Sequence, residues 1–236
     1  MKPVLLIAAN FLREHRWPVL ILFAWIALTA VAAGGFGRDR VAADDVVFYV
    51  QQQAVYICVF SAFLAAGAIQ NERKSRRILL VLSKAISRSQ YLLAVVLGTW
   101  AVSLVYALLF GLCGVWLTAR GNLPSAGVWS IAILVIAGSL ISATVAMFFS
   151  TFLNPYLATA LALGLMCAPG LFHVQRQAWL LWLPGLPVLL EVLHFGLGSA
   201  WEANWMVVGI AILQSVVFWI MAAAVFKQRD IAVPVE

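Results

Sequence analysis

The residues with the clearest chemical character are six basic side chains that crowd into residues 70–90 against a single acid, Glu72, which leaves this stretch strongly positive. Apolar residues are interleaved with them, and at 3.6 residues per turn Ile78, Leu82 and Ile86 fall on one side of a helix. This pattern predicts a short amphipathic helix that binds through both charge and apolar contact. The alternative is a solvated basic loop that only touches anionic lipid headgroups. The basic residues are Arg73, Lys74, Arg76, Arg77, Lys84 and Arg88.

Motifs that would let the chain catalyse a reaction are missing from its sequence. No Gly-Lys-Ser/Thr follows a glycine loop, so the chain has no phosphate-binding loop and cannot hydrolyse ATP alone. It also has no His-Glu-x-x-His zinc pair and no Gly-x-Ser-x-Gly elbow. Met166, Cys167 and His173 suit a soft metal by type, but the last two do not share a helix face well, so we predict no metal site. The sequence predicts a non-enzyme that works with energy supplied by a partner.

The composition indicates an integral membrane protein. Of 236 residues, 64% are hydrophobic and 10% are charged, whereas soluble domains have about 45–50% apolar and about 25% charged residues. This difference excludes a soluble enzyme, a disordered chain and a secreted scaffold. The three cysteines are odd in number and lie in apolar runs, so no disulfide framework is expected. Because about 20 helical residues cross about 30 Å of hydrocarbon, the length allows at most six or seven spans.

Six apolar runs predict an all-α, polytopic membrane protein in which residues 1–236 form a single transmembrane domain. An interfacial helix over residues 1–16 is expected to lie on the cytoplasmic surface. Arg13 and Arg16 before the first run also resemble the start of a cleaved leader, but we expect that run to be retained as a span. The predicted transmembrane ranges are 17–37, 46–69, 91–118, 128–149, 155–172 and 205–226.

The distribution of Lys and Arg predicts the orientation. If the N-terminus is inside, 11 of the 15 lie on the cytoplasmic side, and residues 70–90 form a cytoplasmic loop. The positive-inside rule selects this arrangement, with both termini cytoplasmic. The basic residues left outside are Arg38, Arg40, Arg120 and Arg176.

Residues 173–204, between the fifth and sixth spans, are predicted to form an extracytoplasmic hairpin. Their central stretch, 179–198, is apolar, yet Pro184, Gly185 and Pro187 interrupt it, so it cannot form one unbroken spanning helix. A broken, re-entrant-like pair of short helices fits if protein covers the freed backbone groups. A seventh span is the alternative.

Few polar residues within the spans mark a pathway. No Asp, Glu, Lys, Arg or His side chain falls inside the six predicted ranges, which argues against a proton-coupled transporter and a charged ion channel. Three consecutive amides near the outer end of the second span are costly to bury, and they either face a cavity or lie at the membrane interface. With a fourth amide in the last span they are our candidates for lining a pathway: Gln51, Gln52, Gln53 and Gln214.

The basic loop resembles that of the ABC-2 type permeases, the membrane subunits of ATP-binding-cassette transporters. Those typically read Glu-Arg/Lys, then Leu-Leu-Ser, a Pro-x-Ser-Arg and Tyr-Leu-hydrophobic. The glycine-threonine usual near residues 75–77 is absent here, and Lys84-Ala85 stands where a proline is usual. The six-span layout, the broken hairpin and the aromatic-basic-Asp tail at residues 226–231 also match. The matching segments of the loop are Glu72-Arg73, Leu80-Val81-Leu82-Ser83, Ile86-Ser87-Arg88 and Tyr91-Leu92-Leu93.

The resemblance implies a permease subunit of an exporter in a bacterial cytoplasmic (inner) membrane. Two permeases, identical or paired with a sister subunit, would enclose the pathway, and two ABC ATPase subunits would dock beneath them. ATP and Mg²⁺ are then expected on the ATPase, while this chain binds no cofactor and no nucleic acid. The loop after the second span would be the coupling helix, assisted by the N-terminal helix. The expected ATPase contacts are Glu72, Arg73, Arg76, Arg77, Leu79, Leu82 and Arg88.

Two further points stay open at the level of the sequence. The uncharged, aromatic-rich spans suggest an amphipathic or lipid-like substrate, or a peptide. The alternative to a permease is a non-transporting membrane-anchor subunit of a larger complex, with the basic loop binding a soluble partner other than an ATPase.

Overall fold

The computed structural model describes residues 2–35, 41–74, 87–171, 183–194 and 204–228. Within these ranges the chain forms eight helices and no strand, so the all-α prediction is confirmed for the described residues. The helices are α1 (Lys2–Glu14), α2 (Arg16–Gly34), α3 (Ala43–Lys74), α5 (Arg88–Gly121), α6 (Ala126–Ser150), α7 (Pro155–Leu171), α8 (Leu186–Leu193) and α9 (Trp205–Gln228).

Five of the described helices are long and apolar enough to cross a membrane, namely α2, α3 as far as Ile69, α5, α6 and α9. They are the helices of a multi-pass membrane protein. The fifth predicted span coincides with α7, an apolar helix of 17 residues. At 1.5 Å per residue α7 reaches about 25 Å, slightly less than the roughly 30 Å of a hydrocarbon core.

Helix α6 forms the centre of the bundle and packs against α3, α5, α7 and α9. It is apolar around its whole circumference, as expected for a helix that is covered by others. Small buried residues, among them Ala137, Gly138 and Ser142, allow the neighbouring backbones to approach closely, as is usual between membrane helices. The hydroxyl of Ser142 donates to the carbonyl oxygen of Ser139 at 3.1 Å, so this polar group is satisfied within the helix.

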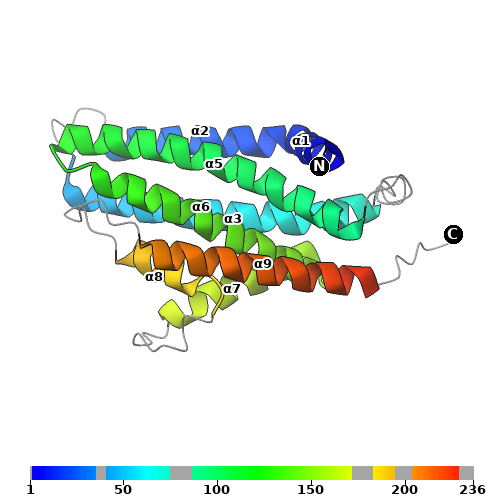
Figure 1. The fold of residues 1–236 in the computed structure, drawn as a ribbon. Coiled ribbons are helices and arrows are strands. Elements are labelled where there is room, and N and C mark those ends of the chain that lie inside the picture. Colours follow the sequence, from blue (N-terminus) through cyan, green and yellow to red (C-terminus); the bar gives the residue numbers. More distant parts are fainter. Residues whose placement is uncertain (1, 36–40, 75–86, 172–182, 195–203, 229–236) are drawn as a thin grey trace.

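Helix α1 is separate from α2 and lies across the end of the bundle, where it packs on α5 (Figure 1). Val4, Ala8 and Phe11 on one side of α1 are buried, whereas Leu5 and Leu6 are 62% and 71% exposed. The exposed residues of α1 thus include large apolar side chains as well as polar ones such as Arg13, which suits a helix in contact with a membrane surface.

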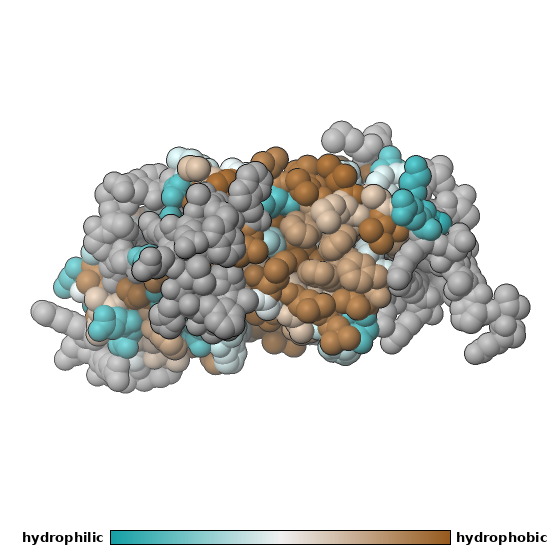
Figure 2. Space-filling view, turned by 90° about the horizontal axis from the view of Figure 1, so that it is seen from below, coloured by the Kyte–Doolittle hydropathy of each residue, from teal (hydrophilic) through white to brown (hydrophobic). Residues whose placement is uncertain are grey.

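The first turn of α1, the last turn of α3, the start of α5 and the end of α9 lie at the same end of the bundle (Figure 1). Helices α3 and α5 have 32 and 34 residues, or about 48 and 51 Å at 1.5 Å per residue, so both are longer than a bilayer core. In Figure 2, the view from below, hydrophobic residues cover the middle of the face, and most of the hydrophilic residues lie toward its two ends. This is the surface expected of a membrane-spanning bundle.

Candidate functional site

Most of the predicted coupling loop lies outside the described residues. Residues 75–86 are among those not described, and Glu72 and Arg73 lie in the last turns of α3 with their side chains outside the described part. Of the predicted ATPase contacts, the structure therefore describes the side chain of Arg88. The predicted contacts within residues 75–86 are Arg76, Arg77, Leu79 and Leu82.

Helix α5 begins at Arg88, inside the predicted loop range 70–90, with a capping box. The Ser87 hydroxyl accepts a hydrogen bond from the backbone N–H of Gln90 at 3.3 Å, and the Gln90 side chain accepts one from the backbone N–H of Ser87 at 3.1 Å. This reciprocal arrangement satisfies two N–H groups that the first turn of a helix otherwise leaves without partners. The start of α5 is therefore well defined, with Ser87 as the residue that caps it.

Arg88 connects the start of α5 to the end of α9. Its Nη1 donates to the carbonyl oxygens of Phe226 at 2.9 Å and Lys227 at 3.1 Å, and its guanidinium lies 6.0 Å from the centre of the Phe226 ring. A cation is favourable at a helix C-terminus, where carbonyl groups have no partner within the helix. The structure thus gives Arg88 a contact within the chain, in addition to the partner contact predicted from the sequence.

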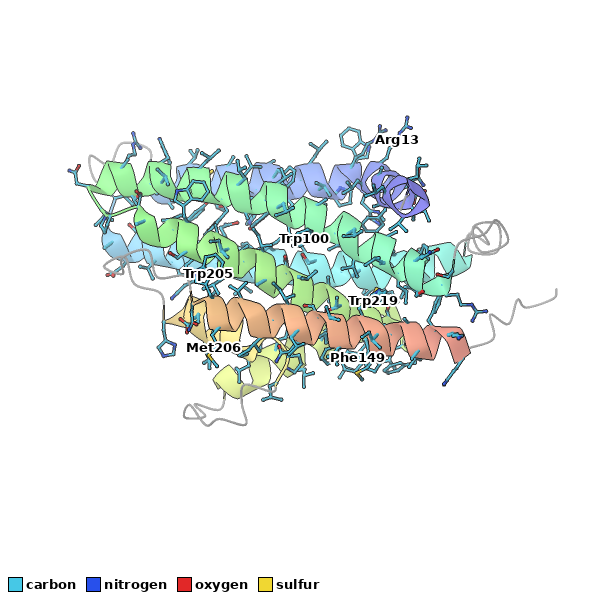
Figure 3. The ribbon with its side chains drawn as sticks, viewed as in Figure 1. Arg13, Trp100, Phe149, Trp205, Met206 and Trp219 are labelled. Atoms are coloured by element: carbon cyan, nitrogen blue, oxygen red, sulfur yellow. The ribbon has the colours of Figure 1, made fainter. Side chains whose placement is uncertain are left out.

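Replacing Arg88 with alanine is expected to lower the free energy of unfolding by about 1 kcal/mol, because two carbonyl groups lose a charged donor. Chemical unfolding of the detergent-purified chain measures this change. Arg13→Ala is the matched control, since Arg13 is an exposed basic residue at the same end of the bundle (Figure 3). If Arg88→Ala is as stable as Arg13→Ala, the contact with α9 does not stabilise the fold.

Helix α1 is fixed to α5 by a close approach at Gly98. A Cβ atom at this position would lie 2.6 Å from Cδ1 of Phe11 and 3.4 Å from the carbonyl oxygen of Ala8. Phe11 packs there in a core cluster with Tyr91 and Val95 of α5. The N-terminal helix is therefore seated on the same helix that leads out of the basic loop.

Gln53, one of the four candidates for lining a pathway, is completely buried. Its Nε2 donates to Thr29 Oγ1 at 2.9 Å, and its Oε1 accepts from the Tyr106 hydroxyl at 2.7 Å. The amide thereby joins α2, α3 and α5. Gln52, the next residue, donates to the Tyr56 hydroxyl at 2.9 Å and lines a pocket of about 230 Å³ between α2 and α3.

Gln51 and Gln214, the other two candidates, bind opposite ends of the short helix α8. Gln51 Nε2 donates to the carbonyl oxygen of Leu193 at 3.2 Å, at the C-terminus of α8. Gln214 donates to the carbonyl oxygen of Leu183 at 3.3 Å and accepts from the N–H of Gly185 at 3.1 Å, at the N-terminus. The structure thus brings Gln51 and Gln214 together at α8, whereas Gln53 lies between α2, α3 and α5.

Beneath α8 lies a cavity of about 240 Å³, which sequence reasoning missed. Its walls come from α3, α6, α7 and α8, and its lining residues are Ala, Val, Leu, Gly, Met and Cys. Residues from four helices cannot be grouped from periodicity alone, so the sequence carried no signal for this cavity. Among the described residues, no group of three or more His, Cys, Asp or Glu side chains could hold a metal ion. His173, part of the trio considered for a metal, lies outside the described residues.

Comparisons with known proteins do not assign the chain to a family. No model of a known protein family matches it, and no curated protein matches its sequence. The likeness to ABC-2 type permeases therefore depends on residues 72–93 and 226–231 and on the order of the helices.

Proposed function

We propose that this chain is the permease subunit of an ABC-2 type exporter, which forms a translocation pathway and is driven by a separate ATPase subunit. One observation supports the proposal above the others: helix α1, the two helix ends that flank the basic loop, and the end of α9 lie together at one end of the bundle (Figure 1). A soluble ATPase could contact all of these elements on one surface. ATP and Mg²⁺ would bind to that partner.

Coupling requires that movement of the ATPase moves the membrane-spanning helices, so the segments between the ATPase contact and these helices must be rigid. The contacts around the loop suit this requirement, because Ser87 begins α5 with a capping box and Arg88 connects α5 to α9. Gly98 and Phe11 seat α1 on α5. A force applied to residues 70–90 would therefore act on α3, α5, α9 and α1 as one connected group.

The proposed topology has six spans and two cytoplasmic termini. In this arrangement α7 crosses the membrane together with the five longer helices, which brings the ends of α1 and α9 to the same side. The Lys and Arg residues of the described part agree with the positive-inside rule, because four of them lie in helix ends on this side and one, Arg120 in the last turn of α5, lies at the other end. The four are Arg13, Arg16, Arg88 and Lys227. A second copy of the chain, or a sister permease, would complete the pathway in a bacterial inner membrane.

The test is co-purification of the tagged chain with its native partners, followed by an ATPase assay. The wild type is expected to bring down a subunit with a phosphate-binding loop. Arg76→Glu and Leu82→Asp, which reverse a charge and remove an apolar contact in the loop, are expected to lose that subunit, and Glu72→Ala is expected to weaken coupling by about tenfold, the equivalent of about 1.4 kcal/mol.

The matched control is Asp44→Arg, a charge reversal of the same size at the opposite end of the bundle, where Asp44 is exposed. This variant is expected to retain the ATPase. If the wild type brings down no ATPase, and a soluble partner without nucleotide-binding motifs comes down instead, the chain is a membrane anchor and the permease proposal is wrong.

A further inference from the structure

The cavity beneath α8 has the chemistry of a hydrocarbon site. Its volume of about 240 Å³ exceeds the roughly 150 Å³ of an engineered apolar cavity that stays dry and takes up benzene. Its lining includes no charged, amide or hydroxyl side chain, and the most polarisable groups are the sulfur atoms of Cys58, Met166 and Cys167. A water molecule needs two to four polar partners to be retained in such a space, and this lining does not provide them.

The cavity is maintained by contacts outside its own interior. Helix α8, which covers it, is bound at its two ends by Gln51 and Gln214. On the opposite wall a Cβ atom at Gly138 would lie 3.1 Å from Val188 and 3.2 Å from Cys58, so α3, α6 and α8 are already in close contact there. The walls therefore cannot easily collapse inward, and an empty cavity would cost stability through lost dispersion contacts.

The position of the cavity determines which molecules can reach it. Its walls on α3 and α6 belong to helices long and apolar enough to span the membrane, so hydrocarbon is the surrounding medium. Val55, which lines the cavity, is 41% exposed, and Leu163 and Leu189 in the lining are half-buried. The space thus adjoins the lateral surface of the bundle, where acyl chains are present.

We propose that this cavity binds the acyl chain of an amphiphilic molecule, with the polar part of the molecule outside it. A hydrocarbon chain matches the lining because it demands no hydrogen bond, whereas a polar ligand would lose its hydration without replacement. The site lies within one copy of the chain and does not involve the ATPase, so a test of this site gives a result that does not depend on the permease proposal. The acyl chain comes from a membrane phospholipid or from a free fatty acid.

The test uses two photoreactive probes on the full chain in lipid nanodiscs: palmitic acid with a mid-chain diazirine, and a phosphatidylethanolamine that carries the same acyl chain. Mass spectrometry then locates the labelled residues. Labelling by at least one probe is expected to be several-fold higher on residues 163–167 and 188–192 than on the exposed α9 residues Ile212, Leu213, Val216 and Val217. An excess of unlabelled palmitate should suppress it. The probe that labels more strongly identifies the source of the chain.

A matched pair of variants tests the location. Leu163→Trp places a large side chain in the cavity and is expected to abolish labelling of α8. Leu161 lies on the same helix and is 49% exposed, so the Leu161→Trp variant should retain the labelling of α8. Competition by palmitate on the wild type provides an answer even if Leu163→Trp does not fold. Labelling that simply follows lipid exposure, equal on α8 and α9 and insensitive to palmitate, would overturn the proposal.

Discussion

Gly98→Leu is expected to displace α1 from α5. Even a Cβ atom at Gly98 would lie 2.6 Å from the Phe11 ring, and a leucine adds three more carbon atoms. Overfilling a packed contact costs about 1–3 kcal/mol. Phe11, which is 7% exposed, would have to leave its position, and α1 with it.

Hydrogen–deuterium exchange of residues 4–14, together with thermal unfolding in detergent, measures the effect. We expect faster exchange throughout α1 and a lower midpoint of unfolding. Gly209→Leu on α9 is the matched control, because no atom lies within 4 Å of a Cβ at that exposed position. Unchanged exchange in α1 of the Gly98→Leu variant would show that the packing against Phe11 does not seat this helix.

Gly185→Ala is expected to destabilise the region of α8 by about 2 kcal/mol, because a backbone cost and a smaller steric cost act at the same residue. Gly185 has φ of +74°, a left-handed conformation that costs other residues about 1–2 kcal/mol. A Cβ atom there would also overlap the Met166 side chain, chiefly its terminal methyl group, which can move aside at a smaller cost. Both the N-terminus of α8 and its hydrogen bonds to Gln214 depend on this position.

Chemical unfolding separates the two costs. Gly185→Ala should carry both. Gly185→Ala combined with Met166→Ala, measured against Met166→Ala alone, lacks the overlap and keeps the backbone strain, since the cost of truncating the buried Met166 cancels. Gly164→Ala is the control, since a Cβ at that helical position meets no atom within 4 Å and alanine favours helix by about 1 kcal/mol over glycine. If Gly185→Ala is as stable as Gly164→Ala, the conformation at residue 185 is not strained by a side chain.

The positions of the apolar helices were predictable from the sequence, because apolarity over about 20 residues is a local property. The predicted range 17–37 corresponds to α2 (Arg16–Gly34), and 205–226 corresponds to α9 (Trp205–Gln228). The boundaries of α3 and α5 were less predictable. Charged residues in the sequence mark the ends of the apolar run. A helix can continue beyond that run, because its backbone hydrogen bonds do not depend on apolar side chains, and α3 continues in this way to Lys74.

The partners of individual polar side chains were beyond sequence reasoning. Arg88 contacts a residue 138 positions away, and Gln51 contacts one 142 positions away. These contacts depend on how the helices pack, which no local pattern records. The four amides could be selected because burial of an amide is costly, yet the structure shows protein partners for each of them.

Photocrosslinking from the basic loop tests the central claim most directly. With a photoreactive benzoylphenylalanine in place of Leu82, expressed in the native host, we predict one major crosslinked protein that carries a phosphate-binding loop and an ABC signature. The same group in place of Asp44, in the first turn of α3 and so at the opposite end of the bundle, should not crosslink to it. A crosslinked partner without nucleotide-binding motifs, or equal crosslinking of the ATPase from both positions, would contradict the proposed docking of an ATPase at this end.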